Sequence, residues 1–395
     1  MTAMTPRQRL LTALRRQEPD RVPCCPLMTR WTRYHHGCVC PQHQVKVAEE
    51  FGLDLLVQYG SYIWQSVSND YIYAPGSGST RLANSFYGDL PDVNLEMSIR
   101  NEKESVWYER TFRTPAGELH DIIQWARPNA GFGDGPNPHR VEPLVKTPRD
   151  VEALKFLYPA PRRDVLSDIP LVLEEIGERA LPAAFDCTHA GSWGLEPLGP
   201  EGMLIAGIEE PELLAAVCRL AQDAHLRNLR AMLELGLPVV WDSWFQCGPS
   251  VGWSLETYRT LFLPLVKETV ELAHEFGALF IYQDDGKMRD IIPLLADIGV
   301  DAVSGLQPPD VGNVILKDVK AQFGNRLALM GGLDPCYTFD LGTPAAVRAA
   351  VRQAIADAGE GGGYILATGE AVDPTTTPAE SIHAAVQATR EYGSY

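Results

Sequence analysis

The strict alternation of strand-like and helix-like segments from Pro238 onward limits the fold more than any other feature of this sequence. Short apolar runs of strand length alternate there with longer segments of helical periodicity. Such alternation predicts parallel strands with helices packed outside them. Over the whole chain we count eight strand-length runs, at residues 22–28, 54–59, 183–188, 238–242, 278–282, 302–306, 327–331 and 363–367.

Eight runs match the strand number of a closed (β/α)8 barrel, or TIM barrel. We therefore expect an α/β fold in which a single barrel domain occupies residues 1–395. An open doubly wound sheet is the alternative, although no glycine-rich phosphate fingerprint follows an early strand. The main outer helices are expected at residues 255–276, 289–298, 345–357 and 378–392. A capping box, Thr5-Pro6-Arg7-Gln8, predicts another helix that begins near residue 6.

The stretch from about residue 65 to residue 143 breaks the alternation. Residues 109–120 are typical of two strands that flank a Pro115-Ala116-Gly117 turn. We therefore expect an antiparallel excursion from the barrel, placed where it could cover the active site.

Composition limits the partners and the location of the chain. Its formal net charge is −17 at pH 7, and so acidic a protein repels phosphate backbones and anionic membrane surfaces. We expect neither nucleic acid nor membrane as a partner. The sequence has no apolar run of about 18 residues and no signal-peptide core near Met1, so we expect a cytoplasmic protein. Its eight cysteines are then expected to be reduced thiols or metal ligands.

Polar clusters follow three of the expected strands, at the carboxyl ends where a barrel carries its reactive groups. They are Asp242-Ser243, then Gln283-Asp284-Asp285-Gly286-Lys287, and Thr368-Gly369-Glu370. Acidic groups gathered at one mouth could bind a cation, act as acid and base, or hold an amine. The alternative is that single members only cap the next helix, as Asp and Ser commonly do.

Two smaller motifs allow more than one interpretation. Cys38, Cys40 and His43 resemble half of a zinc site, but no second half follows, which favours local packing or a substrate-facing loop. His189 follows the third run and is well placed for catalysis, although a hydrogen-bonded core histidine is the equal alternative. We assign His189 and the nearby Trp193 to substrate binding.

Several segments resemble the uroporphyrinogen decarboxylase superfamily. The segments that carry the resemblance are Asp20-Arg21-Val22-Pro23, Trp241-Asp242-Ser243-Trp244, Gly331-Gly332-Leu333-Asp334-Pro335 and Thr377-Pro378-Ala379-Glu380. The similarity is strongest from about residue 185 onward. It implies a TIM barrel and one of two activities. The family includes decarboxylases without a cofactor and methyltransferases that serve corrinoid proteins or thiols, many of them with zinc.

The decarboxylase pattern is only partly present. The resemblance implies carboxylate-binding arginines after the first strand, where this chain has Arg30 and Arg33 beside Tyr34, in a shifted arrangement. The catalytic aspartate of that branch falls near Asp70, and its serine matches Ser243. However, Leu198 stands near the position of the family tyrosine, and Glu370 stands at that of the late histidine. Decarboxylation of uroporphyrinogen itself is therefore not predicted.

The zinc-methyltransferase pattern is altered in its ligands. The resemblance implies His-x-Cys-Gly on the fifth strand and Gly-Cys after the eighth, whereas this chain has Gln283-Asp284-Asp285-Gly286 and Gly369-Glu370. Thiolate and imidazole are thus replaced by oxygen donors, which suit harder ions or none. A divalent metal, zinc or a harder ion, would be held by Gln283, Asp285 and Glu370.

Three functional hypotheses follow. The first is methyl transfer or demethylation of a small methylated metabolite, with a corrinoid protein as the acceptor. In this hypothesis Asp285 and Glu370 protonate or polarise the substrate heteroatom that carries the methyl group, while Asp242 and Gln283 orient that heteroatom. The second is a decarboxylase without a cofactor, in which Asp70 stabilises a protonated intermediate. The third is a barrel that binds a ligand without catalysis. The expected substrate contacts are Arg30, Arg33, Tyr34, His189, Trp193, Ser243, Gln283 and Lys287, and a homodimer is allowed.

Overall fold

A computed structural model of the chain describes residues 3–37, 39–60, 90, 92–126, 139–158, 160, 161, 163, 166–186, 188–309 and 311–395. The chain divides into two compact units. The first comprises Met1–Tyr62, Ser167–Phe185 and Met232–Tyr395, and the second comprises Ile63–Leu166 and Asp186–Ala231. The single domain expected from the sequence remains a prediction.

The first unit is built on a curled sheet of seven parallel strands. Their spatial order follows the chain: β1 (Leu56–Tyr59), β6 (Leu181–Ala184), β7 (Val239–Ser243), β8 (Leu279–Gln283), β9 (Ala302–Leu306), β10 (Ala328–Leu333) and β11 (Tyr364–Thr368). Nearly every strand position is buried, because helices cover a parallel sheet and leave its apolar runs dry. The α/β class with consecutive parallel strands is thus confirmed.

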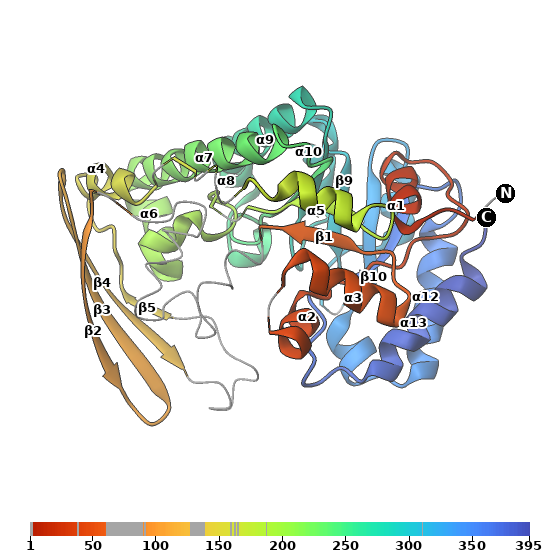
Figure 1. The fold of residues 1–395 in the computed structure, drawn as a ribbon. Coiled ribbons are helices and arrows are strands. Elements are labelled where there is room, and N and C mark those ends of the chain that lie inside the picture. Colours follow the sequence, from red (N-terminus) through yellow and green to blue (C-terminus); the bar gives the residue numbers. More distant parts are fainter. Residues whose placement is uncertain are drawn as a thin grey trace. The chain divides into compact units, whose positions relative to one another are not determined.

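Helices follow most of these strands, as the alternation predicted (Figure 1). The helices described in the first unit are α1 (Pro6–Leu14), α2 (Thr29–His36), α3 (Pro41–Phe51), α5 (Ile169–Ile176), α8 (Leu255–Thr257), α9 (Leu263–Glu275), α10 (Ile292–Asp297), α11 (Leu316–Phe323), α12 (Pro344–Ala358) and α13 (Ala379–Tyr392). The predicted capping box is present at α1, where the Thr5 and Gln8 side chains each bond to the other's backbone N–H. The helix expected at 255–276 is interrupted by a π-helical turn, η4 (Tyr258–Phe262). Pro264, which has no N–H to donate, follows that turn directly.

The first and third expected strands differ from the sequence prediction. Residues 22–28 form only an isolated parallel bridge, Cys24 to Leu366, because Pro23 and Pro26 supply no donor to a ladder. This segment nevertheless hydrogen-bonds on both sides, to Leu366 of β11 and to Asp54, two residues before β1. The third strand begins two residues earlier than expected and ends at Ala184 instead of residue 188.

The second unit contains an antiparallel sheet, in agreement with the expected excursion. Its order is β2 (Asn94–Asn101), β3 (Ser105–Thr114), β4 (Gly117–Ala126) and β5 (His139–Glu142). The predicted turn is confirmed, since Thr114 pairs with Gly117 across a two-residue connection. The unit also contains α4 (Asp150–Leu154), η1 (Lys155–Leu157), η2 (Trp193–Leu198), α6 (Gly199–Glu209) and most of α7 (Pro211–Leu233).

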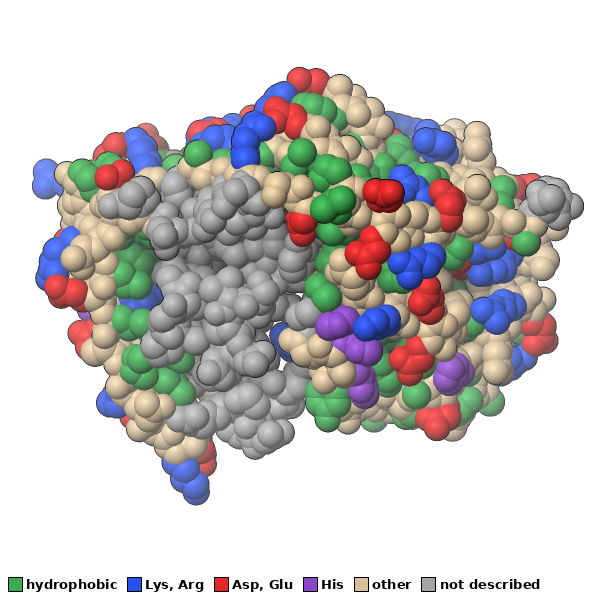
Figure 2. Space-filling view, viewed as in Figure 1, with side chains coloured by type: hydrophobic (Ala, Val, Ile, Leu, Met, Phe, Trp, Pro, Cys, Tyr) green, Lys and Arg blue, Asp and Glu red, His purple; other side chains and the backbone are tan. Residues whose placement is uncertain are grey.

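The described surface carries both signs of charge. Figure 2 shows acidic and basic side chains side by side on the visible face. Among the described residues, no helix has the length and apolar composition needed to cross a membrane.

Candidate active site

The three predicted polar clusters all belong to the first unit and lie at the carboxyl ends of its strands. Asp242 and Ser243 end β7, and Gln283 ends β8 directly beside them, since Ser243 pairs with Gln283 in register. Glu370 follows β11 by two residues. Gln307, one residue after β9, links the loops that follow β8 and β11. Its Oε1 accepts from the Gly286 N–H at 2.9 Å, and a Cβ on Gly369 would lie 2.1 Å from its Cγ.

The carboxyl groups of Asp285 and Glu370 lie within hydrogen-bonding reach of each other. Burial, followed by the charge and hydrogen bond of Glu370, raises the pKa of Asp285 well above its usual value, while the Arg30 charge opposes the rise. Two carboxyls in such contact do not both ionise readily, and the raised pKa of Asp285 favours its protonated form beside Glu370. The structure therefore joins two residues that are 85 positions apart in the sequence.

Asp284, next to Asp285 in the chain, is fully buried. Burial raises its pKa to about 8. Its Oδ1 accepts from the Asp285 N–H at 2.7 Å, and the Tyr282 hydroxyl donates to its Oδ2 at 3.5 Å. Tyr258 donates in turn to the Tyr282 oxygen at 3.1 Å. A cation is not among the groups that perturb Asp284, so the carboxyl is predominantly protonated at neutral pH.

Three further polar residues of the first unit lie close to the carboxyl pair. Arg30 from α2 forms a loose ion pair with Asp373, at 3.7 Å, and its side chain is 45% exposed. Cys336, in the π-helical turn η5 (Pro335–Asp340) after β10, is a free and exposed thiol. Burial and nearby carboxylates, among them Glu370, raise the pKa of Cys336, whereas Arg30 lowers it. The mouth is thus acidic, with one cation at its edge.

Two acceptor oxygens in this cluster still lack a donor. Among the described residues, none donates a hydrogen bond to the buried Oε1 of Gln283 or Oδ1 of Asp285. Buried acceptors of this kind are normally satisfied, so they point to a ligand that brings N–H, O–H or positive charge. The donor set of Gln283, Asp285 and Glu370 is all oxygen. It fits a hard divalent cation and does not fit the imidazole-and-thiolate zinc site that the family resemblance implies.

Several predicted contact residues stand apart from this cluster. Lys287 is exposed, and its backbone N–H donates to the Ser250 hydroxyl at 2.7 Å. Tyr34 is 60% exposed on α2, and Arg33 is half-buried there. Asp70 and the Trp193 side chain lie outside the described residues. No contact of Lys287, Tyr34 or Arg33 with the carboxyl pair is established.

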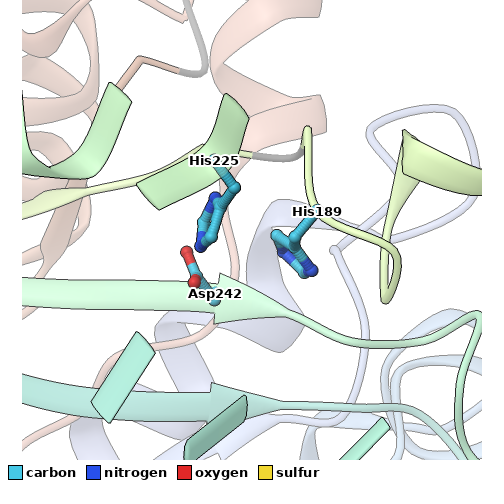
Figure 3. A group of neighbouring side chains, drawn as sticks. All are labelled: His189, His225 and Asp242. Atoms are coloured by element: carbon cyan, nitrogen blue, oxygen red, sulfur yellow. The ribbon is translucent and has the colours of Figure 1, made fainter. Parts of the chain in front are cut away.

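His189 belongs to the second unit, where it lies beside His225 of α7. Their ring centroids are 4.5 Å apart, and both side chains are fully buried. Figure 3 shows the two imidazoles of this unit. The Nδ1 atom of His225 is 3.1 Å from Oδ2 of Asp186. His189 is therefore buried beside His225, and its assignment to substrate binding remains a prediction.

The Cys38, Cys40 and His43 motif is only partly described, because Cys38 lies outside the described residues. Cys40 caps α3 with its backbone, and His43 stacks on His36 with ring centroids 5.1 Å apart. Burial and the His43 charge lower the pKa of His36. The zinc interpretation of this motif remains untested.

Sequence reasoning misses three features of the site. It does not separate Asp284 from Asp285, because packing decides that Asp284 lies beside Tyr282 whereas Asp285 lies beside Glu370. It does not identify Gln307, whose only signal is its position just after a strand. His225 lies within a helix, and its signal would be the polar residues Gln222, His225 and Asn228 at three-residue spacing on one side of α7, all fully buried.

Comparison with known proteins gives one family and one fold. Residues 130–392 match the family described as uroporphyrinogen decarboxylase (URO-D). The chain is 26% identical over 270 residues to uroporphyrinogen decarboxylase from Azotobacter vinelandii, covering 63% of this chain and 69% of that protein. The enzyme of the same name from Pseudomonas paraeruginosa is 25% identical over 273 residues, with the same coverage. Among solved structures, a methyltransferase from Methanosarcina mazei covers 98% of this chain and 99% of its own, with a TM-score of 0.61 and 17% identity. At that identity the likeness concerns the fold.

Proposed function

This chain belongs to the uroporphyrinogen decarboxylase family, and from that premise we propose that it transfers a methyl group from a small methylated metabolite to an acceptor. The methyl acceptor is a corrinoid carried by a partner protein or another nucleophile of similar strength. The buried Asp285 carboxyl, whose pKa is raised by burial and by the adjacent Glu370, carries the proposal. A second copy of the chain as a partner also remains a proposal.

A proton donor is what methyl transfer from oxygen, sulfur or nitrogen requires. The bond between the methyl carbon and the heteroatom breaks, and its electron pair stays on the heteroatom. The methyl carbon forms a new bond to the nucleophile of the acceptor. The heteroatom takes a proton from the carboxyl pair, which makes it a better leaving group, and this general-acid step contributes roughly 10²–10⁴-fold to such reactions. The pair recovers its proton from solvent when the product leaves.

Neighbouring groups keep the pair in its acid form and orient the substrate. Burial and the negative charges of Glu370 and Asp284 all raise the pKa of Asp285, which favours its acid form. The unsatisfied oxygens of Gln283 and Asp285 accept hydrogen bonds from the substrate. If a hard divalent cation binds, these oxygens and Glu370 would hold it, and it would act as a Lewis acid at the heteroatom. Asp242 and Ser243, at the end of β7, complete the polar edge.

The barrel expected for this family supports the same placement of the site. We propose that the seven-stranded sheet closes through residues 23–25, since Cys24 bridges Leu366 and also accepts a hydrogen bond from Asp54. The reactive groups of a closed barrel lie at the carboxyl ends of its strands, where Asp285 and Glu370 are found.

The curated relatives favour decarboxylation of a carboxylate as the second candidate function. That reaction needs Arg30 as a carboxylate-binding group. Arg30 is close enough to lower the pKa of Asp285, which favours decarboxylation. However, the Arg30 side chain is 45% exposed and forms a loose ion pair with Asp373, which argues against a role in binding a carboxylate substrate. A binding protein without catalysis would lack strongly perturbed carboxyls, and both Asp284 and Asp285 are strongly perturbed.

A methyl-transfer assay tests the proposal. The purified chain is incubated with methoxy, methylthio and methylamino compounds and with cob(I)alamin, and methylcobalamin is followed by its absorption spectrum. We expect turnover with at least one class, at a rate that falls as pH rises through the raised pKa of Asp285, because its acid form is required. The absence of methyl transfer across the panel, together with release of carbon dioxide from a carboxylate, would replace the proposal with the second candidate.

Variants of the pair separate chemistry from folding. Asp285→Asn removes the acidic proton and Glu370→Gln removes the neighbouring charge that raises the pKa of Asp285, while the shape of each side chain is kept, and each is expected to lower kcat by roughly 10²–10⁴-fold. Asp290→Asn, on the same loop but exposed and paired with Arg289, is the matched control and should retain full activity. Equal losses in all three variants would contradict a specific acid role.

A further inference from the structure

We propose that His189 and His225 form a metal-binding pair in the second unit, with Asp186 as the residue that orients His225. The site takes a transition-metal ion of the zinc, cobalt, nickel or copper class. It uses no residue of the carboxyl cluster, so it is independent of the function proposed above.

The two imidazoles are buried and close together. Both side chains are fully buried, their ring centroids are 4.5 Å apart, and the ring planes are tilted by 59°. A nitrogen of His189 lies within 4.8 Å of one of His225, a distance that a shared ion could bridge. Buried polar side chains are costly unless they serve a network or a ligand.

Asp186 determines which nitrogen of His225 can bind a metal. Its Oδ2 accepts from Nδ1 of His225 at 3.1 Å, from the Thr188 hydroxyl at 2.6 Å and from the Asn228 amide at 3.1 Å. The carboxylate has no proton to give, so Nδ1 of His225 carries the hydrogen and Nε2 carries the lone pair. A histidine oriented by a carboxylate through its second nitrogen is the usual arrangement around protein-bound zinc.

His189 is fixed by its own backbone. Its carbonyl oxygen accepts from the N–H groups of Ser192 and Gly194, at 3.1 and 2.9 Å. A Cβ on Gly194 would lie 2.5 Å from the Thr188 oxygen and 2.6 Å from the His189 carbonyl carbon. The turn is therefore too tight for any other residue at position 194, and it holds His189 in one place beside His225.

The protonation state of the pair agrees with metal binding. Burial, followed by the neighbouring His225, lowers the pKa of His189 well below its usual value, so the ring is neutral at physiological pH. Metals bind the neutral imidazole. Imidazole nitrogen favours zinc and its neighbours in the periodic table, and calcium and magnesium, which prefer oxygen, are not expected.

Metal titration of the full chain tests the proposal. The protein is stripped with a chelator, dialysed and titrated with Zn²⁺ or Co²⁺, with calorimetry and cobalt absorption as readouts. We expect about one ion per chain, with binding lost in His189→Ala and in His225→Ala. Asp186→Asn should weaken affinity by about 10–100-fold without abolishing binding, since it changes only the orientation of His225. His274→Ala is the matched control, because His274 also pairs with an aspartate, Asp301, at 2.8 Å but is partly exposed.

A measurement on the unaltered chain covers the case in which the buried variants do not fold. With ¹⁵N-labelled histidine, Zn²⁺ should shift the nitrogen resonances of two of the nine histidines, one of which keeps a protonated Nδ1. The same variants assayed for methyl transfer show whether the metal matters to the reaction. Uptake that survives in both alanine variants, or an unchanged nitrogen spectrum, would overturn the site and leave the carboxyl cluster unaffected.

Discussion

Asp121 in the antiparallel sheet and Asp284 at the end of β8 are both fully buried aspartates, yet their carboxyls are held in opposite states. Burial alone would raise the pKa of Asp121, but Arg110 and Arg140 hold it below its usual value of 3.8. Arg110 donates to Asp121 from Nε at 2.8 Å and from Nη2, and Arg140 donates to the same carboxylate. Asp284 has a tyrosine hydroxyl and a backbone N–H but no cation, and its pKa rises to about 8.

This contrast shows how one residue type serves two purposes. An aspartate between two arginines is an ion network that joins three strands, β3, β4 and β5. An aspartate buried without a cation is kept protonated at the expense of stability, which is common where a site requires an acid. The charge partner, and not the depth of burial, separates a structural carboxyl from a functional one.

The largest expected effect is a loss of stability when Asp121 is replaced. Asp121→Asn would leave Arg110 and Arg140 buried with one neutral partner, and breaking a buried network of this kind costs about 3–5 kcal/mol. We expect a correspondingly lower urea midpoint for the second unit, with little direct effect on the carboxyl pair. Glu96→Gln, which breaks an exposed pair with Arg113, is the control and should not shift the midpoint. An equal shift of the urea midpoint in both variants would contradict the structural role assigned to Asp121.

A smaller loss of stability is expected next to Asp284. Gly248 has a φ of −76°, which any residue can adopt, but a Cβ there would lie 2.2 Å from Oδ2 of Asp284. Gly248→Ala must therefore push the carboxyl aside, and overpacking of this kind costs about 1–3 kcal/mol. We expect both a lower unfolding midpoint and a lower methyl-transfer rate. Gly252 is exposed, and a Cβ there would meet no atom within 4 Å, but its φ is +105°. Gly252→Asn therefore strains the backbone without displacing Asp284, and it serves as the control for a loss of stability alone.

The two aspartates should also give opposite pH dependences. Between pH 3.8 and about 8 the folded chain holds a proton on Asp284 that the unfolded chain has lost, so this group's contribution to stability falls as pH rises, by about 1.4 kcal/mol per pH unit. Asp284→Asn removes that slope, and its stability relative to the wild type should rise from about pH 5 to about pH 8. Asp121, whose pKa is lowered, instead loses its contribution as pH falls below 3.8. Parallel curves for Asp284→Asn and the wild type would show that Asp284 is ionised.

Much of the first unit follows from sequence periodicity, because buried parallel strands are apolar on both faces and stand out as runs. The run at residues 22–28 has the right composition, but its two prolines leave it without donors for a ladder, and it forms a single bridge. The helix at 255–276 has the right periodicity, and Pro264 interrupts its hydrogen bonds. Backbone chemistry, and not hydrophobicity, accounts for both differences.

The site is predictable as a location but not as a set of contacts. The ends of strands identify Asp285 and Glu370 as candidates, because parallel strands bring their carboxyl ends to one edge. No spacing in the sequence links positions 285 and 370, or 189 and 225, since those contacts depend on how far each loop folds back. Asp284 stays protonated because no Lys, Arg or His is among the described groups that perturb its carboxyl, and the sequence does not show which side chains pack around it.

The smallest expected effect concerns the hydrogen bond between Tyr282 and Asp284. At 3.5 Å the Tyr282 hydroxyl stabilises the Asp284 carboxylate only slightly, and it lowers the pKa that burial raises. Tyr282→Phe should therefore raise the pKa of Asp284 further, by a few tenths of a unit at most for so weak a bond. Infrared titration of the buried carboxyl band measures this shift directly, and Tyr258→Phe, which removes a hydrogen bond to Tyr282 instead of one to Asp284, is the matched control. A fall of the Asp284 pKa in Tyr282→Phe would mean that the tyrosine oxygen accepts a hydrogen bond from the protonated Asp284 carboxyl. That hydrogen bond would then stabilise the acid form of Asp284 in addition to burial.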